Sequence, residues 1–400
     1  MSLLTPAQAE TLIGQHLTCL PIESLPLTQA AGAVLRENIY AERDQPPFDR
    51  VAMDGIALSV SGAAGNAGRL RVASSQNAGD PPHTLADPTS CIEIMTGAML
   101  PEGCDAVVPV ELVQRSGDIA EIGGKPLQPW QNLHRRGSDC RQGALLLPAG
   151  TRLSAPEVAV AAGAGMARLR VSAQPMIVVI STGNELVEPG EVIEPHQIRR
   201  SNAYGITAAL RQHGYTRVAD DHVRDDEAEL TARLGFHLRT HDVLILSGGV
   251  SMGKLDLVPR VLEKLGVGLV FHHVAQRPGK PMWFGVSQSG PAVFALPGNP
   301  VSTLVCLSRY VLPALRAAMG EVPGEPPRIA LTAPFEVKAP LAFYLPVKLK
   351  SDDWGRTSAE PRPTNGSGDF TALAGTDGFV ELPPGPNTFP KGHVARFFRW

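Results

Sequence analysis

The chain has 400 residues, of which 43% are hydrophobic and 19% are charged, and its formal net charge is −3. This length predicts several domains, and the small negative charge excludes a broad nucleic-acid-binding surface. The five cysteines are scattered without a C-x-x-C pair, which favours reduced thiols in the cytoplasm over a disulfide framework or a zinc site.

The N-terminal segment predicts a helix. Residues 3–20 carry a helical period, and Thr5 and Pro6 fit a cap and a first turn. The segment has no basic n-region and no long apolar core, so we expect no signal peptide. The most apolar stretch, residues 158–167, is too short to span a bilayer, so we expect no membrane association.

The first 171 residues are expected to form two units. Short alternating runs and many glycines predict a β-rich inserted domain over residues 46–144. Residues 1–45 and 145–171 would form a helical and extended N-terminal domain around it. In the second of these segments, Ser154 and Glu157 match a capping box that opens a packing helix.

Residues 172–320 show an alternation of strands and helices, which predicts an α/β domain with a mostly parallel sheet covered on both faces. Residues 321–400 return to short strands and turns and predict a small β-barrel. Strands are expected at 176–180, 243–246, 269–274 and 293–296. The expected helices are one capped by Ser201 and Asn202 and closing near Gly214, one opened by Asp225 and Asp226, one ending at Gly266, and a long one from Asn299 to Met319.

Four loops of this α/β domain are expected at strand ends and carry polar or cationic residues. Because parallel strands present their carboxyl ends at one edge of a sheet, we expect the loops to lie together. Their helix N-termini, free N–H groups, hydroxyls and cations predict a site for one or two polyanions. Glu185 and Asp256 nearby suggest a magnesium ion held by carboxylates and ligand oxygens. The loops are Ser181–Leu186, Ser247–Gly253, Arg277–Pro281 and Pro297–Ser302.

One of these loops is similar to a nucleotide-triphosphate loop but fails a key requirement. Residues Gly248 to Lys254 fit G-x-x-x-x-G-K. The next residue is Leu255, where such a loop needs a Ser or Thr hydroxyl for magnesium. We therefore interpret the loop as an oxyanion cradle, with Asp256 as an acid at the entrance of the following helix.

Two further motifs favour structural explanations when taken alone. Asp54 and Gly55 predict a tight turn in which glycine allows a close backbone approach. His272 and His273 suggest a metal site, but adjacent strand residues point to opposite faces. We therefore do not expect both histidines to bind one ion.

Seven motifs follow one another along the chain. They are Phe-Asp-x-x-Ala-Met-Asp-Gly at 48–55, Met-Thr-Gly-Ala at 95–98, Arg-Gly-x-Asp at 136–139, Ser-Thr-Gly-x-Glu-Leu at 181–186, Ser-Gly-Gly-Val-Ser-x-Gly at 247–253, Arg-Pro-Gly-Lys-Pro at 277–281 and Leu-Pro-Gly-Asn-Pro-Val-Ser at 296–302. In this order they resemble the molybdopterin molybdenumtransferase (MoeA) family, which also includes the gephyrin E domain. A set of ordered motifs that spans most of the chain is far more specific than a single glycine loop.

The resemblance implies an elongated homodimer of four-domain chains. Its α/β domain would have the three-layer fold shared with molybdopterin adenylyltransferases, and that enzyme is an expected partner. The implied reaction converts adenylylated molybdopterin and molybdate into molybdenum cofactor and AMP, with Mg²⁺ as cofactor. The active site would be composite, because the N-terminal half of a partner subunit would complete the cleft.

The resemblance also implies roles for single residues. Asp54, Asp139, Asp256 and Lys280 would be catalytic, and Glu185 and Asp256 would bind the metal. Asp54, Thr96 and Asp139 would come from the partner subunit. The substrate-binding residues would be Thr96, Ser181, Thr182, Gly183, Ser247, Gly248, Gly249, Ser251, Arg277, Pro281, Gly298, Asn299, Ser302 and Ser367.

The chain departs from the family pattern at three positions. Asn184 stands where an aspartate is common, Lys254 where an acidic residue is frequent, and Pro346 nearest to an expected molybdate-binding arginine. These changes suggest a divergent subgroup, a tungstate preference or weakened insertion activity.

Two alternatives to the molybdenumtransferase function stay open. Residues 172–320 alone would fit a molybdopterin adenylyltransferase, although that enzyme needs neither flanking module. A binding protein that delivers pterin to another insertase is the non-enzyme alternative.

Overall fold

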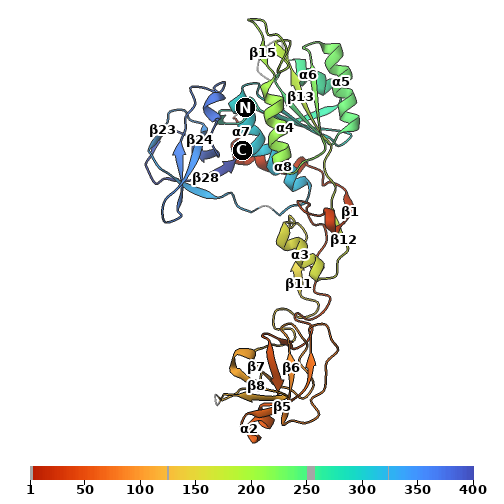
Figure 1. The fold of residues 1–400 in the computed structure, drawn as a ribbon. Helices are drawn as coiled ribbons and strands as arrows, with labels where there is room; N and C mark the ends of the chain where they lie inside the picture. The colour runs from red at the N-terminus through yellow and green to blue at the C-terminus, as the bar shows by residue number, and fades with distance from the viewer. Residues whose placement is uncertain (1–2, 124–125, 250–256, 323) are drawn as a thin grey trace.

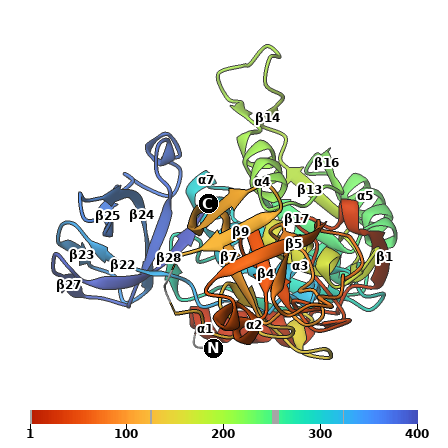
Figure 2. The same cartoon turned by 60° about the horizontal axis from the view of Figure 1, so that its bottom comes forward.

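A computed structural model of the chain describes residues 3–123, 126–249, 257–322 and 324–400. The molecule is elongated, with a β-rich module at one end and an α/β domain beside a β-barrel at the other (Figure 1). A second view shows the barrel beside the rest of the molecule (Figure 2). In the same view, a loop near β14 protrudes from the α/β domain. Among the described residues, no helix combines the length and apolar character needed to cross a membrane.

The β-rich module at the far end, here called the distal module, extends from β3 to β10. Its main sheet has the strand order β7-β4-β6-β5-β9-β8. Alternate residues of β4 enter two different cores, since Ala57 packs in one and Ile56 and Leu58 pack in the other. The sheet is therefore buried on both faces. The elements are β3 (Arg50–Val51), β4 (Gly55–Leu58), α2 (Val60–Gly65), β5 (Arg69–Gln76), β6 (Ser90–Ile94), β7 (Ala106–Pro109), β8 (Val113–Ser116), β9 (Ile119–Ile122) and β10 (Leu133–His134).

A narrow region connects the distal module to the rest of the chain. Antiparallel pairs β1–β12 and β2–β11 surround α3, where the Glu157 carboxylate accepts the Ser154 N–H (2.9 Å), so the predicted capping box is confirmed. The capping box at Thr5, at the start of α1, is also present. Helix α1 packs on the α/β domain, because its residues Ala9 and Ile13 lie in the core of that domain. The elements are α1 (Pro6–His16), β1 (Ile22–Pro26), β2 (Ile39–Tyr40), β11 (Leu145–Leu147), α3 (Ala155–Gly163) and β12 (Arg168–Ser172).

The α/β domain contains a six-stranded sheet of order β16-β13-β17-β21-β20-β18. Its first four strands are parallel to one another, and β20 runs antiparallel to both of its neighbours, β21 and β18, so the predicted mostly parallel sheet is confirmed. The strands are β13 (Ile177–Thr182), β16 (Val218–Val223), β17 (Val243–Ser247), β18 (Val267–His272), β20 (Trp283–Ser287) and β21 (Ala292–Leu296), with a small parallel pair β14 (Leu186–Val187) and β15 (Ile198–Arg199) beside them.

Helices cover both faces of this sheet because its strands are apolar on both sides. Ile177 and Val179 of β13 pack on one face with α4 and the last helix of the domain. Val178 and Ile180 pack on the other face with α5 and α6. The helices are α4 (Ser201–Gln212), α5 (Glu227–Thr240), α6 (Leu257–Lys264), α7 (Pro300–Cys306) and α8 (Leu312–Ala318).

The structure corrects three sequence predictions in this domain. The long helix from Asn299 to Met319 is interrupted by a π-helical turn at Leu307–Val311. The N-cap of α4 is Arg200, which makes no side-chain cap bond, so the predicted caps Ser201 and Asn202 were wrong. Strands β16 and β20 were missed.

The C-terminal domain is a closed β-barrel. Strand β24 pairs with β25 and also with β26, which closes the ring β24-β25-β22-β28-β26 and confirms the predicted barrel. A short strand of the α/β domain, β19 (Gln276–Arg277), adds to the edge of β24. The other strands are β22 (Arg328–Leu331), β23 (Phe335–Val337), β24 (Ala342–Ser351), β25 (Thr357–Pro361), β26 (Gly378–Leu382), β27 (Asn387–Phe389) and β28 (Val394–Arg399).

Candidate functional site

The carboxyl ends of β13, β17 and β21 lie side by side. In the parallel register, Ser181 is opposite Ser247, and Ser247 is opposite Leu296. The three strands therefore end level, and the described residues that follow them start from one edge of the sheet.

A pocket of about 540 Å³ opens at this edge, and we call it the serine pocket. Ser181 and Ser247 are almost fully buried, at 1% and 3% exposure. Arg200 Nε donates to Ser181 Oγ (3.1 Å), and Asn202 Nδ2 donates to Ser247 Oγ (2.8 Å), so both hydroxyls have fixed positions. The predicted site residues that line this pocket are Ser181, Thr182, Glu185, Ser247, Gly248, Gly298 and Asn299.

A second pocket of about 350 Å³ lies between the α/β domain and the barrel, and we call it the cationic pocket. Lys280 and Arg277 supply its positive charge, and both residues are exposed. Tyr344 of β24 and Gln276 of β19 lie in its wall and are fully buried. The predicted site residues that line this pocket are Arg277, Lys280, Pro281, Asn299, Ser302 and Ser367.

Asn299 lines both pockets and links the two domains. Its Nδ2 donates to Ser367 Oγ (2.8 Å), and the Val301 N–H donates to the Ser367 carbonyl (3.1 Å). The barrel loop therefore takes one of the N–H groups at the N-terminus of α7. The two pockets adjoin at a hydrogen-bonded contact between domains.

Two glycines after β17 are required by close packing at this edge. A Cβ on Gly248 would lie 2.7 Å from the Thr182 carbonyl oxygen, and one on Gly249 would lie 2.7 Å from Val258. Both residues also have positive φ angles, 101° and 66°. Only glycine fits these positions without strain, so this part of the loop approaches Thr182 closely.

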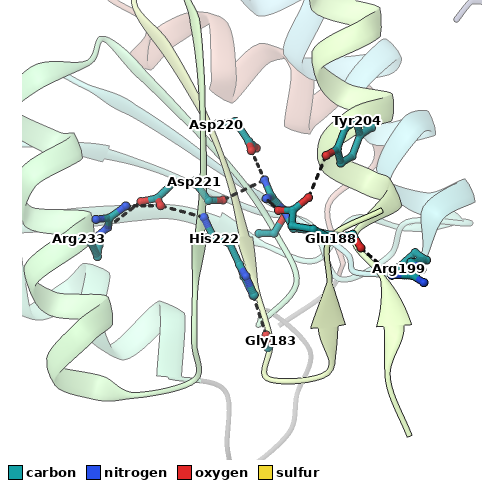
Figure 3. A network of polar contacts seen from close by, with 10 residues as sticks. Gly183, Glu188, Arg199, Tyr204, Asp220, Asp221, His222 and Arg233 are labelled. Atoms are coloured by element: carbon teal, nitrogen blue, oxygen red, sulfur yellow. Dashed lines mark hydrogen bonds and ion pairs between the residues drawn. The ribbon is translucent and has the colours of Figure 1, made fainter. Parts of the chain in front are cut away.

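A network of polar contacts supports the serine pocket, and sequence analysis missed it (Figure 3). Arg200, 4% exposed, forms ion pairs with Glu188 and Asp220. Tyr204 Oη donates to Glu188 (2.9 Å). Burial opposes ionisation of Glu188, but hydrogen bonds from Tyr204 and Arg200 hold its pKa below the ordinary value. Glu188 is therefore an ionised structural partner of Arg200.

The loop after β13 is fixed by its own contacts. His222 Nε2 lies 2.9 Å from the Gly183 carbonyl oxygen (Figure 3). Asn184 Oδ1 accepts the Asp225 N–H (3.2 Å), so the residue that replaces a common aspartate has a structural contact here. Glu185 is exposed at the serine pocket.

Among the described residues, Glu185 is the one predicted metal ligand at the site. Glu185 lines the serine pocket, whereas Ser251, Lys254 and Asp256 lie outside the described residues. No group of three or more His, Cys, Asp or Glu residues that could hold a metal ion occurs within the described part of the chain. Magnesium can be held by one or two carboxylates with ligand oxygens, so Glu185 fits that ion and not an all-protein metal cage.

Three predicted catalytic-cleft residues line neither pocket. Asp54 and Thr96 belong to the distal module, at the end of the molecule opposite the α/β domain (Figure 1), and Asp139 lies between β10 and β11. In the distal module, Asp54 Oδ1 accepts hydrogen bonds from Thr96 Oγ1 (2.7 Å) and Thr96 N–H (2.6 Å), which lower the pKa of Asp54. A Cβ on Gly55 would lie 1.9 Å from the Val108 carbonyl oxygen, so the predicted close approach is confirmed. Asp139 lies where the connecting segments meet, with its N–H bonded to the Gln45 carbonyl (2.9 Å).

The histidine pair differs from its prediction. The rings of His272 and His273 stack with centroids 3.9 Å apart. Strand β18 ends at His272, and His273 has a φ of 82°, so the alternation of faces in a strand does not apply to the pair.

Comparisons with known proteins cover nearly the whole chain. Residues 4–165 match the MoeA N-terminal region (domain I and II), residues 178–317 match a probable molybdopterin binding domain, and residues 328–398 match the MoeA C-terminal region (domain IV). The chain is 38% identical over 400 residues to a molybdopterin molybdenumtransferase of Synechocystis sp., covering 100% of both chains. It is 36% identical over 311 residues to molybdopterin molybdenumtransferase 2 of Mycobacterium tuberculosis, covering 76% of each.

Solved structures show the same similarity. A crystal structure of a molybdopterin biosynthesis MoeA protein from Pyrococcus horikoshii superposes with a TM-score of 0.81 at 32% identity, covering 100% of this chain and 99% of that one. A second crystal structure from the same organism gives a TM-score of 0.83 at 25% identity and covers 100% of both chains.

Proposed function

The chain belongs to the molybdopterin molybdenumtransferase (MoeA) family, and from this membership we propose how its residues carry out the reaction. The protein is a transferase of molybdenum cofactor biosynthesis. In the reaction that we propose, adenylylated molybdopterin and molybdate give molybdenum cofactor and AMP.

We assign one substrate to each pocket. The cationic pocket suits molybdate, a tetrahedral dianion, because Arg277 and Lys280 offer positive charge and Ser302 a hydroxyl. The serine pocket suits the phosphate groups of adenylylated molybdopterin, because its hydroxyls and backbone N–H groups are hydrogen-bond donors. The observation that carries the proposal is that Asn299 lines both pockets, so that the two substrates would meet there.

Release of AMP requires cleavage of the P–O bond that joins it to the pterin phosphate. Negative charge grows on the leaving phosphate oxygen, and a cation held nearby lowers the barrier. Because the cationic pocket adjoins the serine pocket at Asn299, we assign this role to Lys280 in addition to its contact with molybdate. We propose Asp256 as the acidic residue that orients an attacking water.

Magnesium would be held by Glu185, together with Asp256 and substrate oxygens. When bound, the ion would neutralise charge on the pyrophosphate. Glu188 and Asp220 are excluded from this role because both already pair with Arg200.

The composite site is the second part of the proposal. Asp54 and Thr96 belong to the distal module, which lies at the opposite end of the molecule from the α/β domain (Figure 1), and Asp139 lies between β10 and β11; none of the three lines either pocket. We propose that a second copy of the chain contributes them, so that a homodimer forms two sites. The five cysteines are free thiols, which fits the proposed cytoplasmic location, and molybdopterin adenylyltransferase remains the proposed supplier of substrate.

The test incubates the purified protein with adenylylated molybdopterin, magnesium and molybdate, and measures AMP. We expect release of AMP, with a loss of about a hundredfold or more for Lys280→Ala if it stabilises the leaving group. Binding of the pterin without AMP release would instead favour the carrier function. Formation of adenylylated molybdopterin and pyrophosphate from molybdopterin and ATP, without AMP release, would favour the adenylyltransferase.

A complementation experiment tests the composite site. Asp54→Ala and Lys280→Ala copies should each be inactive alone, because every site lacks one residue. In mixed dimers, one site regains both residues, so activity should reappear. Mixed dimers that stay as inactive as the parents would contradict the shared site, and two wild-type copies carrying different tags provide the mixing control.

A further inference from the structure

The loop that carries Arg277 and Lys280 is held from beneath by a buried side-chain amide. Gln276 is fully buried, and its Nε2 donates to the carbonyl oxygens of Pro278 (3.1 Å) and Gly279 (3.3 Å). An amide nitrogen offers two donors, so one side chain fixes two successive peptide groups. The backbone of this loop is therefore oriented by Gln276.

This orientation determines where the backbone N–H groups point. In a planar trans peptide the C=O and N–H bonds point in opposite directions. Because the carbonyls of Pro278 and Gly279 face the Gln276 amide, the N–H groups of Gly279 and Lys280 are turned away from it. Neither N–H donates to another described residue, and both residues line the cationic pocket. Successive N–H groups of this kind form a cradle for an anion.

Gly279 cannot be replaced without losing this geometry. Its φ is +91°, and a Cβ there would lie 2.6 Å from Cys306 Sγ and 2.7 Å from Gln276 Nε2. The loop thus packs against both the amide and α7, which leaves it no room to shift toward the interior.

Two buried tyrosines fix the orientation of the amide. Tyr310 Oη donates to Gln276 Oε1, and Tyr344 Oη lies 3.2 Å from Tyr310 Oη. Since the one proton of Tyr310 is used on Gln276, Tyr344 must donate to Tyr310. Burial raises the pKa of both tyrosines, so both keep their protons. Donation therefore runs in one direction along the chain of hydrogen bonds: Tyr344 donates to Tyr310, Tyr310 donates to Gln276, and Gln276 donates to the loop carbonyls.

The helix that carries Tyr310 is irregular at this position. Tyr310 lies in the π-helical turn Leu307–Val311, which interrupts the helix between α7 and α8. Such turns add a residue at a cost in stability and occur frequently at functional sites.

We propose that Gln276, oriented by Tyr310 and Tyr344, is a positioning residue that presents the N–H groups of Gly279 and Lys280 to the oxyanion. This inference rests on the proposed function in taking molybdate as that oxyanion. Pro346 lines the same pocket near the position where the family pattern has an arginine, so the backbone donors carry a larger part of anion recognition in this chain.

Steady-state kinetics of AMP release test the role. Tyr310→Phe removes the hydroxyl that orients Gln276, and Gln276→Leu removes the amide itself. We expect each variant to raise the KM for molybdate by about tenfold, as loss of one or two buried hydrogen bonds would. The KM for adenylylated molybdopterin should change by less than about twofold. Because Tyr310 acts through Gln276, the double variant should have the same molybdate KM as Gln276→Leu.

Tyr215→Phe is the matched control, because Tyr215 is equally buried in the same domain and lines neither pocket. An unchanged molybdate KM in folded Tyr310→Phe, an equal rise of both KM values, or multiplicative effects in the double variant would each overturn the inference. Equilibrium dialysis with molybdate alone separates it from the proposed function. Weaker binding by Tyr310→Phe would support the positioning role even if the wild-type protein released no AMP, and equal binding would overturn it.

Discussion

Arg200 joins three segments that are far apart in the sequence. Its guanidinium pairs with Glu188 in the loop after β14 and with Asp220 on β16, and it donates to Ser181 at the end of β13. The Arg200 side chain is 5% exposed, whereas those of Glu188 and Asp220 are 36% and 46% exposed. The cation is therefore buried, but its carboxylate partners can still be hydrated.

We expect Arg200→Met to lower the free energy of unfolding by about 2 kcal/mol. Breaking a fully buried pair costs about 3–5 kcal/mol, and hydration of the two partly exposed carboxylates reduces that cost. Urea denaturation measures the change, and Arg211→Met, at an exposed position on α4, the helix that follows Arg200, is the control. Equal stability of the two variants would show that the network contributes little.

Single residues also show how far sequence analysis reaches. The serines, glycines and cations of the four loops were predicted because each follows a strand in the sequence. Arg200, Asn202 and Gln276 were not, because their partners are distant along the chain and no local pattern marks them. Ser251 and Asp256 lie outside the described residues, so their roles remain predictions.

Strand β16 lies at the edge of the α/β sheet and is tied to α5 by one carboxylate. Asp221 accepts hydrogen bonds from Arg233 Nε (2.9 Å) and from His237 Nε2 (2.7 Å). Burial opposes its ionisation, but hydrogen bonds from Arg233 and His237 hold the pKa of Asp221 below the ordinary value. The unfolded chain therefore binds this proton at higher pH than the folded protein does.

This shift predicts a specific pH dependence for Asp221→Asn. The stabilisation by ionised Asp221 is complete above the unfolded pKa of about 3.9 and is lost as the pH falls through the lower folded pKa. The variant should be less stable by about 1–3 kcal/mol from pH 5 to 7, and the difference should shrink below about pH 4. Denaturant unfolding across this range measures it, with exposed Glu263→Gln as control. A difference that grows in acid would contradict the assignment.

Most elements were predicted where a single period dominates the sequence. Apolar runs identified β13, β17 and β21, and caps identified α1, α3 and α5. Strand β16 was missed because Asp220, Asp221 and His222 break its apolar pattern. Each of these three polar side chains makes a contact with a residue outside β16. The π-helical turn was missed because its five residues are all buried and continue the apolar helical pattern of α7 and α8, so no local signal marks it.

The whole molecule has several separate hydrophobic cores. Ile92 lies in a core of the distal module, and Ile245 lies in a core of the α/β domain. Only a narrow region of short strand pairs and α3 connects these parts (Figure 1). Parts with their own cores and few shared contacts are expected to unfold separately.

Scanning calorimetry should therefore show more than one transition. Ile92→Ala should lower the transition of the distal module by roughly 10 °C or more, since such truncations cost about 2–5 kcal/mol in a domain of this size. The other transition should keep its midpoint. Ile245→Ala is the reciprocal variant, and a single transition that shifts with both substitutions would show that the molecule unfolds as one unit.

The pairing of β19 with β24 has a consequence for recombination between homologous proteins. Gln276 and Arg277 belong to the α/β domain in sequence but extend the sheet of the barrel, opposite Ala342 and Phe343. A chimaera joined in the linker after α8 would put a foreign strand beside β19 and a foreign side chain in place of Tyr344. Chimaeras that keep residues 276–400 from one parent should therefore retain the KM for molybdate of that parent. Chimaeras in which the barrel alone is exchanged should have a raised KM for molybdate.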